Sequence, residues 1–346
     1  MSSKAALAIL LLALAGGAGA SAPAAGDASA APTPAAAGFK HLGYASCAQS
    51  TCHGAATPWM ISPIRQNEYF QWRDHDPHAH AYAGLSGPRA QAIAAKLGVS
   101  EAAKTPLCLG CHSDNVPEAQ RGENFRIEEG IGCEACHGGS EKWLGQHNLP
   151  DVDPMSMTDR GLYPTWQLQA RTTLCLGCHQ YGQRGADHHL VAAGHPEFSD
   201  DLPAYFAKWP HHFGVDAQYV ARKHPATAAQ TATQTDLQAA GNWAAALASS
   251  EAAHQGLMPE LSFFQCDNCH RGLSQPDRGS TGLPRLDQAA LRRLLASGAL
   301  DGQLRARLSD RAAALDGALL HGDRAAFYNA ARELAADLQA AQAAAR

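Results

Sequence analysis

Apolar residues recur at helical spacing towards the end of the chain. Between residues 286 and 346, leucines lie three and four positions apart, which predicts amphipathic helices. They are Leu286, Leu291, Leu294, Leu295, Leu304, Leu308, Leu315, Leu319, Leu320, Leu334 and Leu338. Residues 236–253 also have a helical pattern, and no convincing run alternates apolar and polar residues as a strand does.

The preceding part of the chain, from residue 39 to about 215, has few long amphipathic stretches. Gly and Pro recur throughout it, which predicts short helices joined by loops. The pattern as a whole therefore predicts a mostly α fold with extensive irregular loops and a helical C-terminal region.

The first twenty residues have the pattern of a secretory signal peptide. Lys4 provides a positive charge, residues 5–18 are apolar, and Ala18-Gly19-Ala20 is typical of a cleavage site. The apolar run is short for a membrane span, although an uncleaved N-terminal anchor is the alternative. We therefore expect export to the periplasm or beyond.

Four segments follow from these patterns. Residues 1–20 are the predicted signal peptide, and residues 21–38, rich in Ala, Pro, Gly and Ser, are a predicted disordered linker. Residues 39–285 contain all the cysteines, and residues 286–346 form a helical extension. No later segment has eighteen uninterrupted apolar residues, so we expect no membrane span in the mature chain.

Charge and composition narrow the function. The formal net charge of the 346-residue chain is −5, which does not indicate a nucleic-acid partner. Aromatic residues make up only 7%, whereas ten cysteines and eighteen histidines are unusually many. Candidate chemistry therefore lies with Cys and His.

All ten cysteines fall into five pairs, and a histidine follows the second cysteine of each pair. Four pairs have the form Cys-x-x-Cys-His, and the first has four residues between its cysteines. The motifs are Cys47/Cys52/His53, Cys108/Cys111/His112, Cys133/Cys136/His137, Cys175/Cys178/His179 and Cys266/Cys269/His270.

Cys-x-x-Cys-His is the attachment signature of c-type haem. The two thiols form thioethers with the two vinyl groups of the porphyrin, and the histidine becomes the proximal ligand of the iron. We therefore expect about five covalently bound haem c groups. The wider spacing at Cys47 and Cys52 allows the intervening residues to loop out.

Disulfides and zinc are the two alternatives. An exported chain with an even number of cysteines could form disulfides, but these do not explain the recurring histidine. Zinc also uses Cys and His, but zinc modules join two such half-sites at set spacings, and five half-sites leave one over. A disulfide stays open as the alternative for Cys47 and Cys52.

Thirteen histidines remain as candidates for the sixth position of each iron. We select those in His-rich or Gly-rich settings, whereas His41, His224, His254 and His321 lack such a setting. His188 and His195 are seven residues apart and would share a face if one helix carried both. The selected distal candidates are His78, His147, His188, His195 and His212. Methionine is the rival axial ligand, with Met60, Met155, Met157 and Met258 in the mature chain.

At these residues the chain resembles the multihaem cytochromes of the cytochrome c-554/c-prime type. The resemblance extends over roughly residues 44–275 and rests on four segments, which are 72–82, 132–147, 192–196 and 259–270. It implies haems stacked in close pairs as an electron path, with His78, His147, His188 and His195 as distal ligands. The resemblance implies the same distal role for His212 less directly.

The chain departs from that group in having a fifth motif and a widened first one. Pentahaem nitrite reductases carry a lysine as proximal ligand of the catalytic haem, and no Cys-x-x-Cys-Lys occurs here. The sequence therefore favours an electron-transfer protein that works with donor and acceptor redox proteins. The alternative is an oxidoreductase of a small nitrogen or sulfur compound at one five-coordinate haem, with Arg73, His75, His80 or His211 as polar neighbours.

Overall fold

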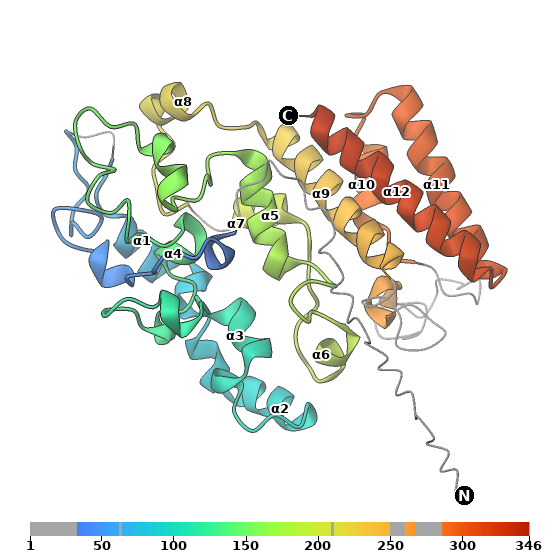
Figure 1. Ribbon diagram of the computed structural model, residues 1–346, viewed down its shortest axis with the longest axis horizontal. Helices are drawn as coiled ribbons and strands as arrows, with labels where there is room; N and C mark the ends of the chain where they lie inside the picture. The colour runs from blue at the N-terminus through green and yellow to red at the C-terminus, as the bar shows by residue number, and fades with distance from the viewer. Residues whose placement is uncertain (1–32, 62–63, 209–210, 250–259, 267–285, 346) are drawn as a thin grey trace, which may run out of the picture. The chain divides into compact units, whose positions relative to one another are not determined.

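The structure is a computed structural model that describes residues 33–61, 64–208, 211–249, 260–266 and 286–345 (Figure 1). Helices of very different length dominate these ranges. The α-helices are α1 (Glu68–His75), α2 (Pro88–Lys96), α3 (Pro106–His112), α4 (Cys133–His137), α5 (Leu168–His179), α6 (His188–Ala192), α7 (Leu202–Lys208), α8 (Ala217–Lys223), α9 (Ala228–Ala248), α10 (Ala289–Ala296), α11 (Gly302–Leu320) and α12 (Arg324–Ala344).

Short 3₁₀ turns punctuate the connections. They are η1 (Pro34–Ala36), η2 (Tyr44–Ser46), η3 (Pro77–His80), η4 (Ala83–Ser86), η5 (Ala102–Lys104), η6 (Glu118–Gln120), η7 (Ile127–Glu129), η8 (Pro154–Arg160) and η9 (Leu261–Phe263). Within the described ranges there is no strand, only isolated bridges such as the one between His41 and Arg121. The predicted mostly α fold with irregular loops is confirmed.

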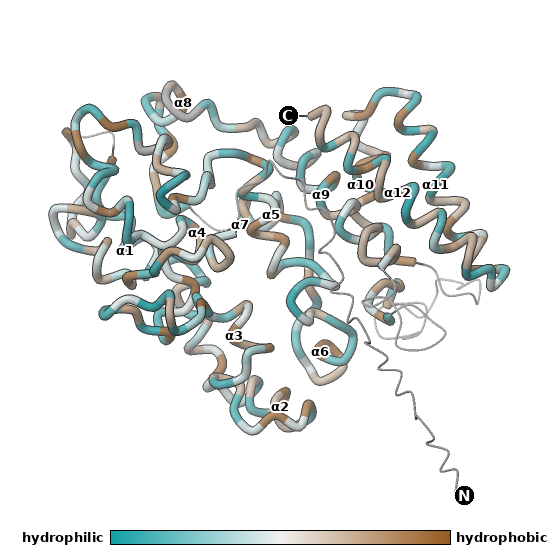
Figure 2. Tube along the Cα trace, viewed as in Figure 1, coloured by the Kyte–Doolittle hydropathy of each residue, from teal (hydrophilic) through white to brown (hydrophobic). Residues whose placement is uncertain are grey.

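The long helices α9 to α12 build the main apolar core. α9 packs against α10 and α12, and α11 packs against α12. Figure 2 shows hydrophobic and hydrophilic residues alternating along α11 and α12 as an amphipathic helix requires. Six of the leucines that predicted these helices are buried at 0–1% exposure, namely Leu291, Leu294, Leu308, Leu315, Leu334 and Leu338.

Side-chain caps decide where these helices begin. Thr227 and Gln230 form a reciprocal capping box at the start of α9, so this helix begins eight residues before the predicted start at residue 236. Asp301 and Asp323 cap α11 and α12 by accepting hydrogen bonds from backbone N–H groups. The weak apolar pattern of 228–235 had hidden the first two turns of α9.

Polar contacts tie α9 to the C-terminal helices. The Arg293 guanidinium on α10 donates to Asp236 of α9 at 2.8 Å and to Asp200 at 2.7 Å. Gln342 Nε2 on α12 donates to the Leu237 carbonyl at 2.7 Å. Gly241 leaves room for this contact, because a Cβ at that position would collide with the Gln342 side-chain amide. Residues on both sides of the predicted boundary at 285 therefore share one core; the boundary itself stays a prediction.

The part of the chain with the cysteine motifs has only small apolar clusters. One joins Leu85, Ala94, Ala102 and Leu109, and another joins residues around Trp143. Packed chain already begins at η1, where Pro34 is buried. The last residues of the segment predicted as a linker are thus part of this packed region.

Several predictions fall on residues outside the described ranges. The signal peptide (1–20), the first part of the linker, Cys269 and His270 are among them. None of the helices in the described part combines the length and the hydrophobicity needed to cross a bilayer.

Candidate functional site

Three of the cysteine motifs form the ends of helices. α3, α4 and α5 each stop at the histidine of a motif, namely His112, His137 and His179. On a helix, residues three and four positions apart lie on one face. The helical backbone therefore presents both thiols and the following imidazole on the same side.

The first motif has a different backbone. Residues 47–53 form a compact turn in which the His53 N–H donates to the Cys47 carbonyl at 3.0 Å. Gly54 follows directly, and a Cβ at this position would collide with the Ala48 carbonyl. The extra residues are looped out, as the wider spacing predicts, and His53 remains directly after Cys52.

The nine cysteines that the structure describes are all unbridged. The disulfide alternative for Cys47 and Cys52 thus finds no support. Thiols of different motifs instead lie close to one another. A hydrogen bond with Cys133 and, to a smaller extent, burial raise the pKa of Cys47. A hydrogen bond with Cys178 and, to a smaller extent, burial raise the pKa of Cys111. The first motif therefore adjoins the third, and the second adjoins the fourth.

Each of the four described motif histidines faces a second histidine from a distant part of the chain. The ring centroids lie 6.0–6.3 Å apart in every case. The pairs are His53 with His147 (6.2 Å, planes 16° apart), His179 with His78 (6.0 Å, 89°), His112 with His195 (6.3 Å, 89°) and His137 with His212 (6.1 Å, 85°).

This common separation fits a metal ion between two imidazoles. A metal–nitrogen bond of about 2 Å on each side places the two ring centroids about 6 Å apart. Direct ring packing would not require one value in four unrelated places. Two protein ligands suit a porphyrin iron, which takes its other four nitrogens from the macrocycle, whereas structural zinc uses four protein ligands.

In five of the paired histidines, Nδ1 lies within hydrogen-bond distance of an oxygen atom, as is usual for histidines that bind a metal through Nε2. His53 Nδ1 lies 3.0 Å from a Glu68 carboxylate oxygen, and His78 Nδ1 lies 2.9 Å from Asp76. The Nδ1 atoms of three others lie 2.8–2.9 Å from backbone carbonyls; they belong to His112 (to Ala81), His147 (to Leu144) and His195 (to Pro196). A donating Nδ1–H leaves Nε2 unprotonated for a metal.

Burial favours the neutral form of two motif imidazoles, and the neutral form is the one that binds a metal. Burial, with smaller effects from neighbouring histidines, lowers the pKa of His137 to about 3 and that of His179 to about 4. At His78 burial acts in the same direction, but the hydrogen bond and charge of Asp76 outweigh it and raise the pKa.

His188 and His195 do not lie on one helix. α6 carries His188 but ends at Ala192, and Gly194, with φ 115°, turns the chain before His195. His195 is consequently free to face His112. The His188 backbone N–H donates to Glu260 at 3.0 Å, in the segment that leads to Cys266. His270 lies outside the described ranges.

Other candidates have different surroundings. His211 lies between the rings of Phe206 and Phe213, and His75 and His80 are exposed. Met60 is 79% exposed, and Met157 packs with Trp143. His41, which the sequence did not single out, is fully buried, with Nδ1 2.6 Å from Asp114.

The sequence reasoning missed the acidic partners Glu68 and Asp76. A signal was present for Asp76, because an Asp directly before Pro77 is a common helix cap and its side chain also accepts from the His78 N–H. Nothing in the sequence links Glu68 to His53, since the contact depends on how α1 returns to the first motif.

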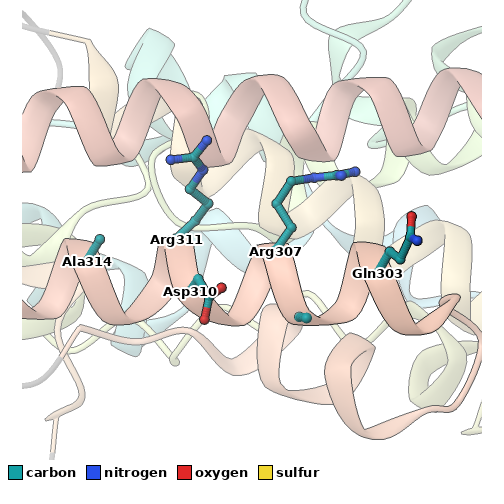
Figure 3. A pocket seen from close by; sticks show the side chains of 6 residues that line it. Gln303, Arg307, Asp310, Arg311 and Ala314 are labelled. Carbon is teal, nitrogen blue, oxygen red and sulfur yellow. The ribbon is translucent and has the colours of Figure 1, made fainter.

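A hollow of about 640 Å³ lies on α11, away from the motifs (Figure 3). Arg307 and Arg311 reach from its lining towards α12, where they form ion pairs with Asp337 and Glu333. Neither Cys nor His lines the hollow. We therefore place the candidate site at the paired histidines.

Comparison with known proteins supports haem attachment at the motifs of one segment. Residues 46–138 match the model of the family cytochrome c554 and c-prime. This segment therefore resembles c-type cytochromes. The matched segment is about a quarter of the sequence and includes the first three motifs and His78. The likeness supports covalently bound haem c as the cofactor and electron transfer with redox partners as the role. No curated protein and no solved structure matches the chain.

Proposed function

We propose that this protein is a periplasmic multihaem c-type cytochrome that carries electrons through about five covalently attached haems, most of them held between two histidines. The observation that carries the proposal is the single separation of 6.0–6.3 Å in four histidine pairs. In each pair the motif histidine is the proximal ligand and its facing histidine is the distal ligand.

The same scheme assigns the fifth site. Cys266 and Cys269 attach the fifth haem, His270 is its proximal ligand, and His188 is its distal ligand. The bond from the His188 N–H to Glu260, at the start of the segment leading to Cys266, supports this assignment.

Two imidazoles per iron suit electron transfer rather than catalysis. Bound haem supplies a one-electron couple, and axial histidines favour low reduction potentials in comparison with methionine. The chain's own contribution is to bring two imidazoles together, to orient them through Nδ1 and to keep the sixth position closed to substrate. The carboxylates of Glu68 and Asp76 orient two of the rings, and backbone carbonyls orient the other rings whose Nδ1 has a partner.

Contacts between motifs support an order for the electron path. Cys47 meets Cys133, and Cys111 meets Cys178, so the first site adjoins the third and the second adjoins the fourth. Burial, with a smaller contribution from Cys175 and Cys178, raises the pKa of the Cys136 thiol, which supports a short distance between the third site and the fourth. We infer that electrons pass along the haem sites in the order first, third, fourth and second. The fifth site joins this path near Cys266.

Export and partners complete the proposal. Residues 1–20 act as a signal peptide, because covalent attachment of haem in bacteria takes place outside the cytoplasm. In the periplasm the protein receives electrons from one redox protein and passes them to another.

The test is a count of haems combined with a search for an open iron. The pyridine haemochrome of the purified protein should correspond to about five haems per chain, all reversibly reducible at an electrode. Addition of cyanide, nitrite or nitric oxide should leave the spectrum unchanged. Steady turnover of such a molecule at one haem would instead establish the oxidoreductase, and a protein without haem would refute both.

A further inference from the structure

One carboxyl group lies between the first and the third motif without belonging to either. Glu129, at the end of η7, accepts a hydrogen bond through Oε2 from the Tyr44 backbone N–H at 2.9 Å. The Tyr44 carbonyl in turn accepts from the Cys47 N–H at 2.8 Å. On the other side, Glu129 Oε2 lies 4.0 Å from the position of a Cβ on Gly132, which directly precedes Cys133.

The surroundings of this carboxyl are mainly acidic. Glu134 is 2% exposed, and its carboxylate accepts three backbone N–H groups, from Leu42 (2.9 Å), Gly43 (2.7 Å) and Ser140 (2.7 Å). Those bonds hold the Glu134 carboxylate beside Glu129, where its charge raises the pKa of Glu129.

The nearest cation offers Glu129 little compensation. Arg126, on the same turn, uses its guanidinium to bind the carbonyls of Glu123 and Phe125. Asp114 also lies close to Glu129 and is paired with His41. Tyr44 faces Tyr69 and Arg73 of α1. Glu128, the neighbouring residue, is exposed.

Burial and repulsion by Glu134 and Asp114 raise the pKa of Glu129 to about 7, whereas the Tyr44 N–H and Arg126 act in the opposite direction. The carboxyl is half-buried, so it still exchanges protons with water. It therefore combines a position between two electron-transfer sites with an affinity for protons that is balanced near neutral pH.

We propose that Glu129 takes up one proton from water when an electron is delivered to the first or third haem site. This inference rests on the proposed function. The electron comes from an electrode or a donor protein and removes one unit of positive charge close to the carboxylate. The carboxylate then gains a proton and becomes a neutral carboxylic acid, so the net charge around the two sites is unchanged.

Linkage fixes the direction of the effect. If an added electron strengthens proton binding at Glu129, the bound proton must equally strengthen electron binding. The reduction potential of the coupled haems is therefore higher when Glu129 is protonated and falls as the pH rises through about 7.

The experiment is a redox titration of the holoprotein at several pH values, with Glu129→Gln and Glu128→Gln for comparison. In the wild type we expect the potential of one haem or a pair of haems to fall between about pH 6 and 8. The amide of E129Q imitates the protonated acid, so its potential should stay at the wild-type low-pH value throughout. E128Q should behave as the wild type does.

Infrared difference spectra of the reduced minus the oxidised wild type add a measurement that needs no variant. A C=O stretching band of a protonated carboxyl should appear on reduction near pH 7 and be absent in E129Q. The inference is overturned if reversibly reducible haems show no pH dependence in this range, or if E129Q retains the wild-type dependence. A protein that binds no reducible haem would overturn the proposed function itself.

Discussion

A ring nitrogen is available to a metal only when the other nitrogen holds the proton, and this is where single residues matter most. His195 illustrates the point, because its Nδ1 lies 2.8 Å from the Pro196 carbonyl while the ring faces His112 at 6.3 Å. The outer partner sets both the tautomer and the orientation of the ring. Residues such as Asp76 and Glu68 therefore act on the site without touching the cofactor.

Replacement of His195 by Ala should open one iron. The haem attached to Cys108 and Cys111 would keep His112 but lose its distal ligand, so we expect one high-spin ferric signal per chain and binding of cyanide at that haem. His189→Ala is the matched control, since His189 lies in the same segment with its side chain 72% exposed. An unchanged low-spin spectrum in H195A would contradict the pairing of His112 with His195.

At the scale of single residues, the sequence alone predicted part of the candidate site. The motif spacing predicts the proximal histidines, because attachment chemistry requires the His to follow the second Cys. The distal candidates could be selected by setting, but their partners could not. His78 faces His179 rather than a neighbouring motif because long loops, and not local spacing, bring them together.

At the scale of elements, the C-terminal helices are stabilised by ordinary apolar packing. Leu334 of α12 is 0% exposed and belongs to the core shared by α9, α10 and α11. Helical spacing of leucines was sufficient to predict these helices, whereas the start of α9 depended on a cap that the apolar pattern did not reveal.

Replacement of Leu334 by Ala should lower the free energy of unfolding by about 2–5 kcal/mol, because a buried methyl-rich side chain is lost and a cavity remains. Leu320→Ala, at the 54% exposed end of α11, should change it little. Chemical denaturation followed by circular dichroism measures both. Equal effects of the two substitutions would contradict the packing described for α12.

The contact between α9 and α10 should depend on pH. Burial, together with Asp200 and Asp201, raises the pKa of Asp236 to about 6 despite its bonds to Arg293. A carboxyl whose pKa is higher in the folded than in the unfolded chain binds more protons when folded, so its contribution to stability is full below about pH 4 and is lost as the pH rises through about 6.

Asp236→Asn is the corresponding test. Between pH 4 and 6 the unfolding free energy of the wild type should fall more steeply with rising pH than that of D236N. Denaturation midpoints of both proteins across this range provide the measurement. Parallel curves would show that Asp236 titrates normally.

At the scale of the whole molecule, the cysteine motifs and the long helices have different sources of order. The motif region has small apolar clusters and paired histidines, whereas the C-terminal helices share one leucine-rich core. The mostly α class and the C-terminal helices followed from the sequence. The order of sites did not, because contacts such as that between Cys47 and Cys133 join residues far apart in the chain.

Electron paramagnetic resonance of the fully oxidised protein tests the central claim most directly. The angle between two axial imidazole planes governs the anisotropy of a low-spin ferric haem, and the structure has one pair at 16° and three at 85–89°. We predict low-spin signals alone, with a rhombic component from the His53–His147 site and a larger, strongly anisotropic component from the perpendicular pairs. A stoichiometric high-spin signal from any of these four sites, or the absence of low-spin haem, would contradict the account.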